Sequence, residues 1–225
     1  MINPFLFPVA MVIFMLYLFV KESYQQEKNI SHLKFINQYK FPEGFLLKYS
    51  QKNQNLSNSQ REMVLDGLRQ YFRMCQNSSS SMVTMPSLAV DDAWHEFILF
   101  TREYDAFSNN AFGYYLHHTP AEAMKSKEAE IDSIRMAWRL ACQDEKIDPI
   151  NTERLPKIFS IDSNLAIVGG LVYTLHQLKN LAATKSSSGG SCSGGGSGSC
   201  SGGGSSGSDG GCGGGGCGGG CGGGG

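Results

Sequence analysis

Apolar side chains recur every three or four residues along much of the chain between residues 57 and 182. This spacing places them on one face of each of several α-helices. The first such helix is predicted to start near Ser59, because Ser59 and Glu62 have the S-x-x-E spacing of a capping box. Its apolar face ends at Cys75, which is predicted to be a small buried side chain.

The same pattern predicts further helices toward the carboxyl end. Ser87 is a candidate N-cap for one long helix over residues 88–107. Another is expected from Pro120 to about Lys146, and a short one over residues 174–181. The segment LPKIFSID, residues 155–162, is predicted to be a loop that carries an apolar plug. Residues 57–182 are therefore expected to form one mainly α-helical globular domain.

The amino terminus has a different pattern. None of the nineteen residues from 2 to 20 carries a charge. A helix of this length would be about 28 Å long, close to the thickness of a bilayer core. Residues 1–20 are therefore predicted to be a single transmembrane anchor. A cleaved signal peptide is the alternative, but no basic residue precedes the run. Basic residues follow it from Lys21 onward, which predicts a domain and tail on the cytoplasmic side of the membrane.

Residues 21–56 are predicted to be a juxtamembrane segment, a helix followed by a loop. Pro42 and Gly44 interrupt the helical pattern there. Phe41 and Phe45 lie beside this interruption and are expected to contact the domain.

Composition changes sharply at the carboxyl end. Residues 183–225 consist almost entirely of glycine, serine and cysteine, with Asp209 as the single charge after Lys185. Such a sequence buries too little apolar surface to fold, so a disordered tail is predicted. Five tail thiols are candidate ligands for Cu(I) or zinc, or for a protein partner: Cys192, Cys200, Cys212, Cys217 and Cys221. Because none of them forms a C-x-x-C pair, a plain spacer with incidental thiols is the alternative.

Charge excludes one class of partner. The chain has 19 basic and 20 acidic residues and a net charge of −1. No broad basic surface is therefore available for nucleic acid, and no nucleic-acid partner is expected.

Candidate chemistry gathers between residues 85 and 124. Asp91 and His95 are four residues apart, which places both side chains on one side of a helix. His117 and His118 follow a turn that could bring either ring back beside them. Two histidines and a carboxylate suit zinc, iron or another divalent metal. A structural polar network at the start of the next helix is the alternative.

These residues also carry a resemblance. DDAWHEFILFTREYDAF from Asp91, FGYYLHHTPAEAM from Phe112, LPKIFSID from Leu155 and the glycine and cysteine tail are similar to the bacterial branch of the glycine-rich domain-containing proteins. The similarity spans residues 85–173 and the tail. It implies an α-helical domain of unknown biochemical role. It also implies a cysteine in relatives at the position of Ser108, so a site that used this thiol would be altered or absent here.

Two functions follow from these patterns. The first is a membrane-anchored, non-enzymatic binding or scaffold protein that holds metal in the histidine pocket or in the tail. The second is a metal-dependent, hydrolase-like enzyme with His95 and His117 or His118 as ligands and Asp91 or Glu96 as base. The sequence assigns no catalytic residue and no residue that binds an organic cofactor, and the candidate cofactors are a divalent metal, zinc or iron, or Cu(I).

Overall fold

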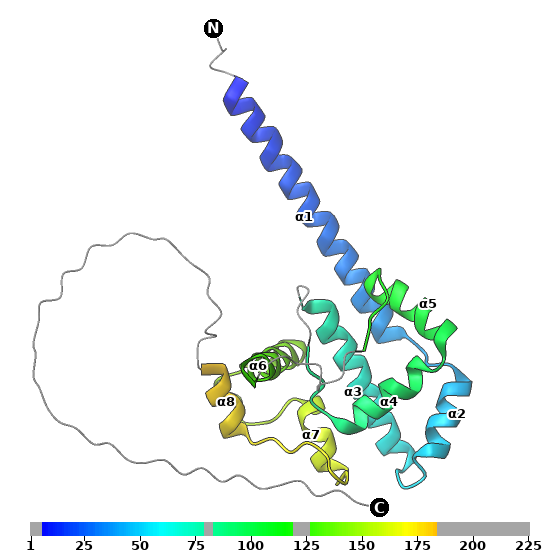
Figure 1. The fold of residues 1–225 in the computed structure, drawn as a ribbon. Helices are drawn as coiled ribbons and strands as arrows, with labels where there is room; N and C mark the ends of the chain where they lie inside the picture. Colours follow the sequence, from blue (N-terminus) through cyan, green and yellow to red (C-terminus); the bar gives the residue numbers. More distant parts are fainter. Residues whose placement is uncertain (1–5, 79–82, 119–126, 184–225) are drawn as a thin grey trace, which may run out of the picture. The chain divides into compact units, whose positions relative to one another are not determined.

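A computed structural model describes residues 6–78, 83–118 and 127–183 (Figure 1). These ranges contain eight α-helices and no strand, so the prediction of a mainly α-helical fold is confirmed for this part of the chain. In chain order the helices are α1 (Leu6–Gln38), α2 (Glu43–Lys52), α3 (Asn58–Asn77), α4 (Leu88–Ile98), α5 (Thr101–Phe112), α6 (Lys127–Asp144), α7 (Lys157–Asn164) and α8 (Leu175–Ala183).

The predicted transmembrane anchor is wrong. No helix in the described part of the chain is both long enough and apolar enough to cross a membrane. The single-pass span over residues 1–20, and the membrane localisation and topology built on it, are therefore not supported.

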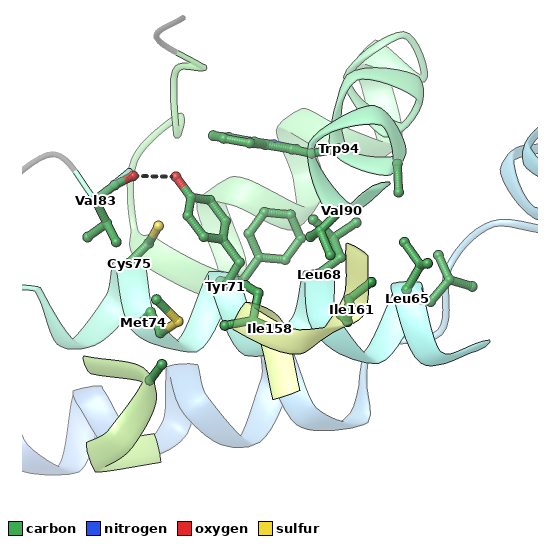
Figure 2. Packing of buried hydrophobic residues seen from close by; sticks show 14 of the residues in the cluster. Leu65, Leu68, Tyr71, Met74, Cys75, Val83, Val90, Trp94, Ile158 and Ile161 are labelled. Atoms are coloured by element: carbon green, nitrogen blue, oxygen red, sulfur yellow. Dashed lines mark hydrogen bonds between the residues drawn. The ribbon is translucent and has the colours of Figure 1, made fainter. Parts of the chain in front are cut away.

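Helix α3 lies at the centre of the helical packing and contacts α1, α4, α6 and α7. Figure 2 shows why: side chains of α3 point toward residues of α4, α7 and the segment before α4. Tyr71 is buried among them and donates a hydrogen bond from its hydroxyl to the carbonyl oxygen of Val83, at 2.8 Å. Cys75 is buried, as predicted, and burial raises the pKa of its thiol to about 12.

Gly67 allows α4 and α7 to approach α3 closely. A Cβ atom at this position would lie 2.4 Å from Cδ1 of Ile161 and 2.9 Å from Cγ2 of Val90. Both distances are shorter than a van der Waals contact, and both atoms belong to buried side chains. The absence of a side chain at residue 67 therefore sets the spacing of three helices.

The start of α3 differs from the prediction by two residues. Ser57 is the N-cap: its hydroxyl accepts a hydrogen bond from the backbone N–H of Gln60, and the Gln60 side chain accepts one from the N–H of Ser57. The capping box therefore uses glutamine, and the predicted pair of Ser59 and Glu62 is wrong. Glutamine supplies the same acceptor oxygen as glutamate in this motif.

The predicted helix over residues 88–107 is two helices. Ser87 caps α4 as expected, but the chain leaves the helical conformation at Phe100 before α5 begins. In an unbroken helix Trp94 and Tyr104 would be about 15 Å apart along the axis. The bend instead brings the Trp94 Nε1 atom to 3.0 Å from the Tyr104 hydroxyl oxygen. Aromatic packing around Phe97, which contacts rings of both α2 and α5, stabilises the bent arrangement.

The segment LPKIFSID is a helix rather than a loop. Pro156 is the N-cap of α7, where its missing N–H and fixed φ are tolerated. Ile158, Phe159 and Ile161 are buried, so the predicted apolar plug is confirmed. The segment 165–174 that follows α7 forms turns and contains neither helix nor strand.

The end of α1, together with α2 and the turn between them, contributes more to the core than expected. Ile36, Phe41, Phe45 and Tyr49 are all buried in the same apolar cluster as α3 and α4. Pro42 does interrupt the chain, but α2 starts directly after it where a loop was predicted. The hydrophobic core therefore begins within the segment predicted to be juxtamembrane.

Two sets of predictions lie outside the described residues. One is the tail over residues 184–225 with its five cysteines. The other is the helix start predicted at Pro120, because α6 is described only from Lys127. The remaining cysteines, Cys75 and Cys142, are both buried free thiols.

Candidate metal centre

The amino end of α4 is fixed by a buried carboxylate from α7. Asp162 accepts hydrogen bonds from the Ser87 hydroxyl at 2.6 Å, the Leu88 N–H at 2.7 Å and the Ala89 N–H at 3.2 Å. It also accepts one from the N–H of Leu171 at 2.8 Å. Two of these donors are amide groups of the first turn, which have no partner inside the helix. Asp162 is 2% exposed, so this contact anchors the helix that carries Asp91 and His95.

A second set of contacts fixes the segment that returns after α5. Gly113 ends α5 with a φ of +80°, a left-handed conformation that glycine adopts without strain. The Tyr104 hydroxyl donates a hydrogen bond to the carbonyl oxygen of Leu116 at 2.6 Å and accepts one from Trp94. The Trp94 ring also contacts the His118 ring edge to face, with centroids 4.5 Å apart. Trp94 thus contacts the His118 ring directly. Through its hydrogen bond to Tyr104 it also restrains Leu116, two residues before His118.

Asp91 lies between two histidines. Its Oδ1 atom is 3.0 Å from His118 Nε2, and its Oδ2 atom is 3.5 Å from His95 Nδ1. The two ring centroids are 4.2 Å apart. One ligand atom from each of the three residues lies within 4.8 Å of the other two. The structure therefore brings together three of the four residues proposed for the pocket.

Solvent reaches this group from one side. The side chain of His118 is 15% exposed and that of Asp91 is 24% exposed, whereas that of His95 is 48% exposed. The buried Trp94 ring covers the inner side. An ion bound here could exchange a ligand with solvent without any change in the helix packing.

The group is more open than an occupied zinc site. Tetrahedral zinc with bonds of about 2.0–2.2 Å holds neighbouring ligand atoms about 3.3 Å apart. The two contacts of Asp91 use different carboxylate oxygens, and one ligand atom from each residue lies within 4.8 Å of the other two, so the side chains would have to move closer together around an ion. Three protein ligands leave a fourth position for water, the pattern of zinc sites with an open coordination position. Without an ion, the same residues form a polar network centred on the Asp91 carboxylate.

The other histidines lie elsewhere. His117 is exposed, and its ring packs on Tyr115 with centroids 4.8 Å apart, so it is not part of the group. The Nδ1 atom of His32 is 3.0 Å from the Gln76 amide nitrogen. Burial, together with the charge of nearby Lys28, lowers the pKa of His32. His176 is exposed on α8.

Glu96, one of the two bases considered for an enzyme, is held by lysines. Its Oε1 atom is 2.6 Å from Lys48 Nζ and its Oε2 atom is 3.5 Å from Lys52 Nζ. The hydrogen bond from Lys48 outweighs the effect of burial and lowers the pKa of Glu96. Ser108, at the position where the resemblance implies a cysteine, is fully buried and lies outside the group of three.

Asp162 is the residue that the sequence analysis missed. Its signal was present, since Ile158, Ile161 and Asp162 share one face if the segment is helical. A carboxylate on an otherwise apolar face indicates a buried acceptor that needs donors. Predicting a loop for LPKIFSID concealed that signal.

Comparisons with known proteins give one match. A family model described as UCP032817-like matches residues 31–195, which include every helix from α2 to α8 and the three residues of the candidate centre. No curated protein and no solved structure matches the chain. The description of the family names no activity, so the site must be interpreted from its own geometry.

Proposed function

The chain belongs to the UCP032817-like family, and we propose that its helical domain binds one divalent transition metal ion through Asp91, His95 and His118. The observation that carries the proposal is the convergence of these side chains from α4 and from the segment after α5. Two imidazoles and one carboxylate are ligands that zinc and iron(II) accept. Zinc is the ion we expect, because it requires only four ligands.

The surroundings of the site favour binding over hydrolysis. A hydrolase that uses a metal-bound water needs a base near that water. Glu96 is unsuited to this role, because its carboxylate pairs with Lys48 and its lowered pKa makes it a weaker base. Asp91 would itself be a ligand. We therefore propose a non-enzymatic role in which the domain holds the ion and leaves one position open to a partner or to solvent.

A zinc titration tests the proposal. The tail thiols must first be replaced, because they could bind zinc themselves. We define the tail-serine chain as the full-length protein with all five tail cysteines replaced by serine. Calorimetry should detect one zinc ion per tail-serine chain. His118→Asn in the same background is expected to weaken binding by at least about 100-fold, because even residues that only support metal ligands contribute 10- to 100-fold.

His117→Asn is the matched control. It makes the same change at the adjacent residue, whose ring packs on Tyr115 outside the group. It should leave zinc affinity within about threefold of the parent. Equal losses in the two variants, or a stoichiometry that does not depend on His118, would rule out this site. The tail thiols are a separate candidate for Cu(I) or zinc, and titrating the parent beside the tail-serine chain measures their share.

A further inference from the structure

A polar groove of about 470 Å³ lies on α3, away from the three residues of the candidate metal centre. The end of α1, one face of α3, the end of α6 and residues 154–157 form its walls. Seven of its nine lining residues are charged, four basic and three acidic. This volume falls within the range of small-molecule sites, about 300–1,000 Å³.

The two inner carboxylates of the groove are already satisfied. Both oxygens of Asp144 accept hydrogen bonds from Arg73, each at 2.7 Å. Glu145 accepts from the Gln70 amide at 3.0 Å and the Lys157 N–H at 2.5 Å through Oε1, and from Arg154 through Oε2. Burial acts to raise the pKa of Glu145, but these hydrogen bonds outweigh it and the pKa is lowered. Neither carboxylate therefore has a vacant oxygen for a cationic ligand.

The basic residues of the groove, by contrast, have hydrogen-bond donors that no described residue accepts. The Lys157 ammonium has no hydrogen bond or ion pair with any described residue. Arg154 and Arg69 each donate to a carboxylate through Nη1 alone, although a guanidinium carries five N–H groups. The Arg69 guanidinium also lies 4.9 Å from the centre of the Phe41 ring, a cation–π contact that restrains its orientation.

We propose that this groove binds a small oxyanion with several acceptor oxygens, of the phosphate or pyrophosphate type. Guanidinium groups match the geometry of phosphate oxygens, and the Lys157 ammonium supplies a positive charge that no described residue pairs. The acidic residues would orient the arginines rather than repel the ligand, because their charges are already paired. A longer polyanion is disfavoured, since the chain has a net charge of −1 and no extended basic surface.

The site is independent of the metal centre, since none of its lining residues is Asp91, His95 or His118. Loss of one binding function should therefore leave the other intact. His118→Asn, which is designed to remove the metal site, is expected to keep full affinity for the anion. This variant also controls for any effect of metal ions on an anionic ligand.

Titration of the full-length, chelator-treated protein with inorganic pyrophosphate tests the proposal. Calorimetry at low ionic strength should show saturable binding of one pyrophosphate per chain. Lys157→Gln should weaken this binding about tenfold, the effect of losing roughly 1.4 kcal/mol of interaction. The substitution removes an exposed side chain and keeps the backbone N–H that Glu145 uses, so folding should be unaffected. Glycerol phosphate and inorganic phosphate, titrated in parallel, distinguish an esterified ligand from a free one.

Lys40→Gln is the matched control, because Lys40 is also exposed and does not line the groove. It makes the same change in net charge and should leave the affinity unchanged. Absence of saturable binding to the parent chain would overturn the proposal. So would equal weakening by both lysine variants, which would indicate nonspecific attraction, or an unchanged affinity in Lys157→Gln.

Discussion

Replacing Asp91 by asparagine is expected to weaken zinc binding by the tail-serine chain at least about 100-fold. Asp91 is the only carboxylate in the group of three, and its two oxygens each face one histidine. An amide has nearly the same shape but carries no charge, and its nitrogen is not a ligand. The variant therefore loses the anionic ligand and the group that orients both imidazoles, while the helix packing should be kept.

Asp92→Asn provides the control for this prediction. Asp92 is the adjacent residue on α4, but its side chain is exposed and lies outside the group. Both substitutions remove one negative charge from the same turn of the helix, so they change the general electrostatic field similarly. Zinc affinity within about threefold of the parent is expected for Asp92→Asn. A comparable loss in the two variants would mean that general charge, rather than coordination by Asp91, attracts the ion.

Replacing Asp162 by alanine should produce the largest loss of stability, about 3 to 5 kcal/mol in the free energy of unfolding. The carboxylate accepts four hydrogen bonds, from Ser87, Leu88, Ala89 and Leu171. Alanine would leave those donors without their partner at a site that is 2% exposed. Denaturant unfolding followed by circular dichroism measures the change.

Two further variants make this result specific. Asp162→Asn keeps one acceptor oxygen and should lose clearly less stability than Asp162→Ala. Asp105→Ala, at an exposed position on α5, should change stability by no more than about 0.5 kcal/mol. If Asp162→Ala proved as mild as Asp105→Ala, the hydrogen bonds to Asp162 would not anchor α4.

Part of the candidate centre could be predicted from the sequence, because residues four apart on an α-helix lie side by side. The four-residue spacing of Asp91 and His95 determines their neighbourhood on any α-helix. Which of His117 and His118 would join them could not be predicted. That choice depends on the bend at Phe100 and on the hydrogen bond from Tyr104 to Leu116, both of which are tertiary.

The wrong predictions about the fold also concern features that depend on tertiary contacts. Apolar spacing continues without interruption through residues 88–107, so it does not reveal the bend at Phe100. The bend depends on ring contacts of Phe97 with α2 and α5, which are tertiary. The prediction of a transmembrane anchor rested on the uncharged run over residues 2–20 alone, whereas the helix that contains this run continues to Gln38 and carries Ile36 into the core. LPKIFSID was too short for its helical period to be distinguished from a loop, although its buried face is correct.

X-ray absorption at the zinc edge of the full-length, zinc-loaded protein tests the central claim most directly, because the tail thiols remain present and can compete. We expect a first shell of nitrogen and oxygen at about 2.0–2.2 Å, with the multiple-scattering pattern of two imidazoles. His118→Asn should lose one imidazole from that shell. A first shell of sulfur at about 2.3 Å without imidazole scattering, in protein loaded with one zinc ion per chain, would contradict binding at Asp91, His95 and His118.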